Sequence, residues 1–131
     1  MSYYISRLVD LTFDAAVAQT IEGLKAQGFG ILTDIDVQAT LKAKLGADMR
    51  KYRILGACNP SFAHQALQVE DKLGVLLPCN VIVRETDKGQ VEVASVNPVV
   101  SLEKTGNPLL VATAEEVRRR LTAAIGVAAA V

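Results

Sequence analysis

The chain contains no tryptophan, one histidine and two cysteines, and it has no net charge, because fourteen acidic residues balance fourteen basic ones. A neutral chain lacks the clustered basic residues with which nucleic-acid-binding proteins hold phosphates, so we expect no nucleic-acid partner. Two cysteines are too few for a disulfide framework, and in a reducing compartment they are expected to be free thiols. Only 5% of the residues are aromatic, which predicts an aliphatic core.

No segment has the pattern of an export signal or a membrane span. The opening residues, Met1-Ser2-Tyr3-Tyr4, are followed by neither a basic region nor a long apolar stretch. The apolar C-terminal run, residues 123–131, is much shorter than the roughly 20 residues that a spanning helix needs. We therefore expect a cytoplasmic protein without a membrane partner. The length of 131 residues, half of them apolar, predicts one domain over residues 1–131.

Apolar spacing predicts five strands and four helices in the order β-α-β-α-β-α-β-β-α. The Asp87-Lys88-Gly89 turn joins the last two strands as a hairpin, so the sheet is partly antiparallel and the fold class is α+β. Residues 98–108, with Gly106 and two prolines, are expected to form an irregular, mobile loop. The expected strands are residues 2–9, 29–33, 51–58, 79–86 and 90–97, and the expected helix-capping residues are Thr12, Asp36, Asn59 and Thr113.

Two helices are predicted in more detail. The third should run from Asn59-Pro60 to Gly74 and bury a stripe that includes Val69. The last should open with a capping box, in which Glu116 reaches back to the amide of Thr113. The three arginines that follow are expected to face mainly water.

The residues that can carry chemistry lie between Ile54 and Asn80. Cys58 leaves the third strand and Cys79 enters the fourth, and each is followed by an asparagine, with Pro60 after the first pair and Pro78 before the second. Ends of neighbouring strands can meet in space, so the two thiols are candidates for a redox pair, a two-thiolate metal site or two packed thiols. Neither lies in a CxxC pair, which favours simple packing.

Three polar residues complete this candidate site. His64, near the start of the third helix, would form a soft three-ligand set for zinc or copper with the two cysteines, although a surface histidine explains it as well. A single chain offers no strong fourth ligand, although a dimer could share one, and we assign no metal site. Asn59 is explained as a helix cap, whereas Asn80 is unusual in a strand and can line a pocket. The candidate site is thus Cys58, Asn59, His64, Cys79 and Asn80, with no assigned catalytic residue or cofactor.

The same region resembles a known family. The runs that carry the resemblance are Leu55-Gly56-Ala57-Cys58-Asn59-Pro60, the helix with Ala63, His64, Ala66 and Leu67, and Gly74-Val75-Leu76-Leu77-Pro78-Cys79-Asn80-Val81. Together they resemble domain-of-unknown-function family 302, and the likeness is most specific over residues 54–97. It implies a curved, mainly antiparallel sheet packed by helices, of the TATA-binding-protein-like class, and a dimer. It implies no activity and no DNA binding. Many members carry an aspartate where this chain has Asn97, which weakens any acid role there.

Three functions remain open from the sequence. The first is a non-catalytic module that binds a small ligand or a metal as a dimer, with its pocket under residues 98–108. The second is a thiol-dependent redox enzyme using Cys58 and Cys79, which needs two sulfurs close enough to bridge and one exposed thiol of lowered pKa. The third is a structural assembly domain with a large apolar interface. Because no acid–base or nucleophile constellation is visible, the first is favoured, and enzyme activity stays undecided.

Overall fold

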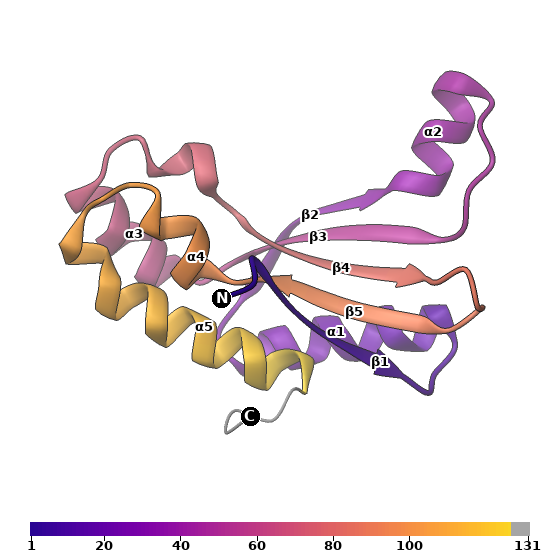
Figure 1. Cartoon of the computed structure of the whole chain (residues 1–131), viewed down its shortest axis with the longest axis horizontal. Helices are drawn as coiled ribbons and strands as arrows, with labels where there is room; N and C mark the ends of the chain where they lie inside the picture. The colour runs from indigo at the N-terminus through magenta and orange to yellow at the C-terminus, as the bar shows by residue number, and fades with distance from the viewer. Residues whose placement is uncertain (127–131) are drawn as a thin grey trace.

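The computed structural model describes residues 1–126, which form a five-stranded sheet with helices packed against one of its faces (Figure 1). The strand order is β1-β5-β4-β3-β2, and all neighbouring strands are antiparallel. The strands are β1 (Tyr4–Val9), β2 (Gly30–Asp36), β3 (Tyr52–Cys58), β4 (Cys79–Glu85) and β5 (Val91–Val96). The α+β class and the order of elements predicted from the sequence are confirmed. Residues 127–131, the end of the apolar C-terminal run, lie outside the described residues.

The helices divide into three groups (Figure 1). The two longest, α1 and α5, lie side by side beneath the sheet, while α3, η1, α4 and η2 gather at one end and α2 stands apart at the other. Their bounds are α1 (Phe13–Ala26), α2 (Val37–Leu45), α3 (Pro60–Val69), η1 (Leu73–Leu76), α4 (Pro98–Glu103), η2 (Pro108–Leu110) and α5 (Val111–Ile125), where η marks a 3-10 helix. Within residues 1–126, no helix is long and apolar enough to cross a membrane.

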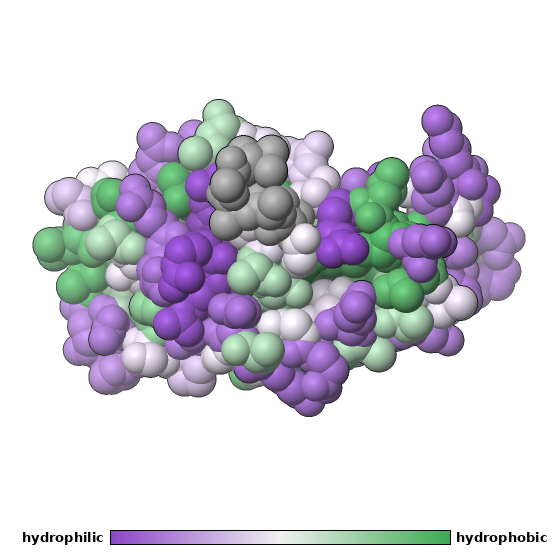
Figure 2. Space-filling view, turned by 90° about the horizontal axis from the view of Figure 1, so that it is seen from below, coloured by the Kyte–Doolittle hydropathy of each residue, from purple (hydrophilic) through white to green (hydrophobic). Residues whose placement is uncertain are grey.

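The core lies between the inner face of the sheet and the pair α1 and α5. Leu55 and Val81 of the central strands are completely buried, as are Leu24 of α1 and Leu121 of α5. Gly23 lets the two helices approach closely, since a Cβ at this position would stand 2.1 Å from the carbonyl oxygen of Ala124. Figure 2 looks onto this helical layer and shows hydrophilic residues over much of it, as expected for amphipathic helices.

Three of the four predicted helix caps are present. The Thr12 hydroxyl accepts a hydrogen bond from the Ala15 amide at 3.2 Å, and the Asp36 carboxylate accepts one from Ala39 at 2.9 Å. The Asn59 side-chain oxygen accepts one from the Phe62 amide at 3.4 Å. In each case a polar side chain satisfies an amide that the first helical turn leaves free.

The fourth cap was wrong, because the last helix begins two residues earlier than Thr113. The Asn107-Pro108 pair starts a 3-10 turn that runs directly into α5 at Val111. Glu116 therefore caps nothing. Its carboxylate instead accepts hydrogen bonds from Arg119 at 2.9 Å and from Arg120 at 3.0 Å.

Two other local predictions also need correction. Residues 98–108 are not one irregular loop, because they begin with α4 and end at Pro108, the first residue of η2. The Asn97 side chain caps α4 and Pro98 occupies its first turn. The helix that begins at Pro60 ends at Val69 rather than Gly74, and Val69 is 41% exposed instead of buried. The chain then turns, and the buried Leu73 belongs to η1.

Candidate functional site

A largely apolar pocket of about 340 Å³ lies at the end of the sheet where β3 leads into α3 and η1 leads into β4. Its buried wall includes Phe29, Ala57 and Leu73, each at most 2% exposed. Its rim includes Leu32 and Leu67, which are 65% and 39% exposed. The pocket is therefore built from the core at its base and opens to solvent between exposed leucines.

Local sequence explains why the chain leaves space here. Asn59 ends β3 and caps α3, so the helix turns away from the strand immediately beside the pocket. Gly56 makes room on the other side of β3, where a Cβ would stand 2.1 Å from the Thr33 hydroxyl oxygen and 2.8 Å from Cγ of Pro78. Pro78 itself follows a cis peptide bond and leads directly into β4.

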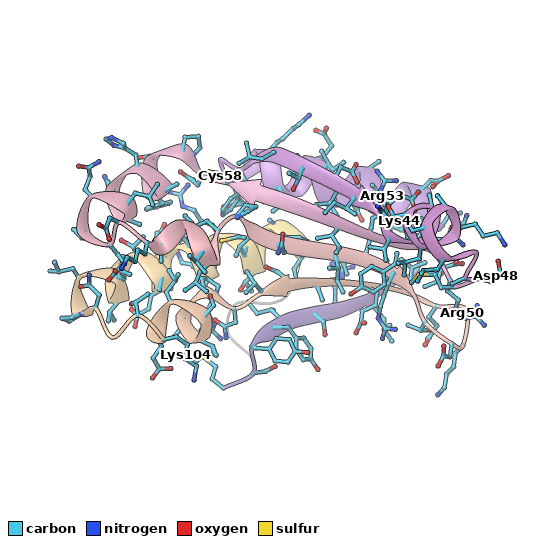
Figure 3. The ribbon with its side chains drawn as sticks, turned by 90° about the horizontal axis from the view of Figure 1, so that it is seen from above. Lys44, Asp48, Arg50, Arg53, Cys58 and Lys104 are labelled. Atoms are coloured by element: carbon cyan, nitrogen blue, oxygen red, sulfur yellow. The ribbon has the colours of Figure 1, made fainter. Side chains whose placement is uncertain are left out.

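The two cysteines both border this pocket as free thiols. Cys79 lies directly opposite Ala57 in the β3–β4 ladder. Opposite residues share a face of the sheet and successive residues alternate, so Cys58 starts on the face opposite to Cys79. Figure 3 shows Cys58 at the end of β3, where the strand meets α3. Both thiols thus line the same pocket, although the two residues start on opposite faces of the β3–β4 ladder.

Burial, with a smaller contribution from the neighbouring Cys58, raises the pKa of Cys79 to about 11. The charged thiolate is disfavoured in an apolar surrounding because it loses its hydration there. At neutral pH roughly one molecule in ten thousand would carry the Cys79 thiolate, which is the reactive form. This thiol thus contributes to the apolar lining and is a poor nucleophile.

The five residues predicted for the site are divided by the fold. Asn59 joins Cys58 and Cys79 at the pocket. His64 is exposed on α3, where its Nε2 atom lies 3.5 Å from the Gln68 amide nitrogen, and it does not line the pocket. Asn80 lines a different hollow of about 580 Å³ with Tyr52, on the face of the sheet away from α1 and α5.

Because His64 lies outside the pocket, it is separated from Cys58 and Cys79, the other two possible metal ligands. Among residues 1–126, no three or more histidine, cysteine, aspartate or glutamate side chains are grouped so that they could hold a metal ion. The possible metal arrangement of Cys58, His64 and Cys79 is therefore not formed. What the pocket offers is apolar surface with the Asn59 amide, the Thr113 hydroxyl and two thiols as its polar groups.

Sequence reasoning missed most of the apolar lining, which comes from α3, α4 and α5. Phe62, Leu102 and Val117 all line the pocket. They belong to apolar stripes that were visible in the sequence, but a stripe facing a pocket has the same spacing as one facing a packed core. The Arg120 guanidinium carbon lies 5.2 Å from the centre of the Phe62 ring, over its face. No sequence spacing indicates that contact.

Comparisons with known proteins cover nearly the whole of this fold. The family model described as "Domain of unknown function DUF302" matches residues 5–128. A crystal structure described as that of the uncharacterized conserved protein DUF302 from Bacillus stearothermophilus is similar, with a TM-score of 0.89 and 26% identity. That similarity covers 95% of this chain and 97% of the other. No curated protein matches the chain. All the elements that build the pocket lie within the matched region.

Proposed function

Since the chain belongs to domain-of-unknown-function family 302 (DUF302), whose name carries no activity, we propose its function from the site. It is a non-catalytic module that binds a small, mostly apolar molecule in the 340 Å³ pocket bordered by Cys58 and Cys79, and it works as a dimer. Its two free thiols fit a reducing compartment, and we propose the cytoplasm. The observation that carries the proposal is an open apolar pocket, of about 340 Å³, lined by few polar groups.

The dimensions of the pocket indicate the kind of ligand. Small-molecule sites usually occupy about 300–1,000 Å³ and combine apolar walls with a few polar groups that fix orientation. An apolar cavity of about 150 Å³ holds benzene, so this pocket has room for roughly two such rings. Among the described residues, no charged side chain lines it, which favours an uncharged ligand or one whose polar end stays at the rim. Asn59 and Thr113 are the groups available to hydrogen-bond it.

The raised pKa of Cys79 speaks against the thiol-dependent redox alternative. Such an enzyme needs a thiolate near neutral pH and two sulfurs that can bridge. Cys79 stays protonated, and Cys58 starts on the other face of the ladder. The same features suit two thiols that serve as small, polarisable lining groups.

The binding test uses the uncharged fluorescent dye N-phenyl-1-naphthylamine, whose two fused naphthyl rings match the space in the pocket while its phenyl ring can lie at the open rim. We expect the dye to brighten on binding and to be displaced by medium-length fatty alcohols. Ala63 lines the pocket, so Ala63→Phe should fill it and weaken dye binding. Ala18→Phe on the exposed side of α1 is the matched control and should bind as the natural chain does. Equal binding by the two variants would refute the assignment of the pocket.

Native mass spectrometry of the freshly purified protein provides a second test. An added mass that is lost on denaturation, and that is absent from Ala63→Phe, would identify a ligand carried from the cell. An added mass present equally in Ala63→Phe would place that ligand outside the pocket and count against the proposal.

A further inference from the structure

The face of the sheet away from α1 and α5 carries a row of apolar side chains. Ile35 stands opposite Ile54, Ile54 opposite Ile82, and Ile82 opposite Ala94, so the row crosses four strands. An antiparallel sheet with one solvated face usually presents polar residues there. We call this the outer face and define it by its apolar residues, which are Tyr4, Leu8, Ile35, Ile54, Ile82 and Ala94.

Several outer-face residues are exposed in the single chain. Leu8 is 53% exposed, Ile35 46% and Tyr4 45%. None of the outer-face residues belongs to the core cluster that α1 and α5 form with the inner face. Figure 1 shows those two helices on the opposite side of the sheet. Exposed apolar area of this kind is normally a site of interaction.

The segment 37–50, which we call the arm, is also largely unburied. It contains α2, in which no residue is buried, and Leu45 at its end is 74% exposed. A helix of nine residues is not stable alone in water, so it needs contacts from elsewhere. Figure 1 shows the arm raised on the side of the outer face. Figure 3 shows Lys44 and Asp48 on the arm, and Arg50 where the arm returns to the sheet and donates to the Asp87 carbonyl oxygen at 3.0 Å.

We propose that the outer face and the arm bind a second copy of this chain, with the two sheets face to face and each arm against the partner. This inference rests on the dimer proposed above and assigns its surface. Five strands about 4.8 Å apart, each about 20 Å long, give a projected area of roughly 400–500 Å² for this hollowed face. A stable interface buries about 800 Å² per partner, so the sheet needs the additional area of the arm.

Charge on the outer face permits two copies to meet. Among the described strand residues of this face, the charged side chains are Arg84 and Glu92, which bond each other at 2.7 Å, so the sheet part is neutral. The arm adds Lys42, Lys44 and Arg50 against Asp48, and Lys42 bonds Asp48 at 2.8 Å. The complete chain is neutral as well, which removes long-range repulsion between copies. A neutral, apolar face suits another copy of itself, since the same patch occurs on both partners of a two-fold dimer.

Sedimentation velocity across a range of concentrations tests this surface. We expect the natural chain to sediment as a dimer, and Ile35→Asp on the edge strand and Leu45→Asp on the arm each to weaken the dimer at least about tenfold. The control is Val75→Asp, because Val75 is 85% exposed at the opposite end of the molecule. Circular dichroism should show that all three variants keep the fold, since each change is at an exposed residue.

Two outcomes would overturn the proposal. One is a natural chain that stays monomeric at the highest concentration. The other is a dimer that Val75→Asp dissociates and Ile35→Asp does not, which would place the interface elsewhere. The dye experiment separates this proposal from the pocket: a monomeric Ile35→Asp that still binds the dye leaves the pocket intact. A dimer without dye binding would refute the pocket alone.

Discussion

The guanidinium of Arg120 lies over the Phe62 ring, 5.2 Å from its centre, and donates a hydrogen bond to the carbonyl oxygen of Gln27 at 3.3 Å. One side chain of α5 thus contacts α3 and the end of α1 beside the pocket. A planar guanidinium can stack on a ring and donate in its own plane at the same time, which an ammonium group does not match. We therefore regard Arg120 as the residue that positions the Phe62 wall of the pocket.

Arg120→Lys should lower the free energy of unfolding by about 1 kcal/mol, because it loses the stacked arrangement while keeping the charge. Urea denaturation measures this change, and dye titration should show weaker binding as Phe62 becomes less restrained. Arg119→Lys is the control, since within residues 1–126 the side chain of Arg119 bonds Glu116 on the exposed surface and no other residue. An equally large loss of stability and dye binding in Arg119→Lys would show that Arg120 does not position Phe62.

The raised pKa of Cys79 predicts that the protein loses stability in alkaline solution. Its pKa is raised from an ordinary value of 9.0 to about 11, so above pH 9 the unfolded chain loses a proton that the folded chain keeps. Stability is complete below pH 9 and falls as the pH rises toward 11, by roughly 2–3 kcal/mol for two pKa units. Denaturation at several pH values measures this loss. Cys79→Ala should lack this component, and a variant with an unchanged alkaline loss would contradict the assignment.

The close packing at Gly23 predicts that replacing this residue with alanine destabilises the protein, although alanine has the higher helix propensity. Alanine normally stabilises a helix interior by about 1 kcal/mol relative to glycine. Here its Cβ would stand 2.1 Å from a backbone oxygen of α5, so Gly23→Ala should separate the helices and destabilise the protein by about 1–3 kcal/mol. Thermal unfolding compares it with Gly30→Ala, where the nearest atom is 4.0 Å away. A gain in stability from Gly23→Ala would show that α1 and α5 are not packed this closely.

Asn97 is held by both ends of its side chain. It is 2% exposed, donates to the Ser2 carbonyl oxygen at 3.0 Å and accepts from the Val99 amide at 3.2 Å. Asn97→Asp keeps the acceptor but places a charge against the Ser2 oxygen, so we expect a loss of about 1–3 kcal/mol at neutral pH.

Acid should partly restore the stability of the Asn97→Asp variant, since a protonated carboxyl can donate to the Ser2 carbonyl oxygen again. Urea denaturation at pH 7 and at pH 4 tests the recovery, with the natural chain measured beside it. If the variant lost as much stability at pH 4 as at pH 7, relative to the natural chain, the hydrogen bond to Ser2 would not be the cause.

Sequence patterns predicted the fold well because its elements begin and end at local signals. Asn59-Pro60 starts α3 as expected, and Asp36 caps α2. The same asparagine–proline signal recurs at Asn97-Pro98 and Asn107-Pro108, and applying it there would have identified α4 and η2. Glycine and proline indicate a loop over residues 98–108, but a proline directly after a capping asparagine starts a helical turn, and this is why the loop prediction is wrong.

The site was less predictable, because it depends on contacts between distant segments. The sequence placed Cys58, Asn59 and Cys79 near one another, and the fold brings all three to one pocket. It did not show that Asn80 lies apart from these three residues. Successive residues of β4 point to opposite faces, so Asn80 lies on the outer face and lines a hollow with Tyr52. The apolar outer face itself was visible only once the register aligned Ile35, Ile54 and Ile82 across three strands.

The most direct test of the central claim is a map of amide chemical shifts in ¹⁵N-labelled protein during titration with N-phenyl-1-naphthylamine. The account predicts that the largest changes fall in Ala57–Leu67 and Leu73–Cys79, which surround the pocket, and that Ala63→Phe abolishes them. Changes concentrated at Ile35, Ile82 and Leu8 on the outer face, or no changes with the dye in excess, would contradict it.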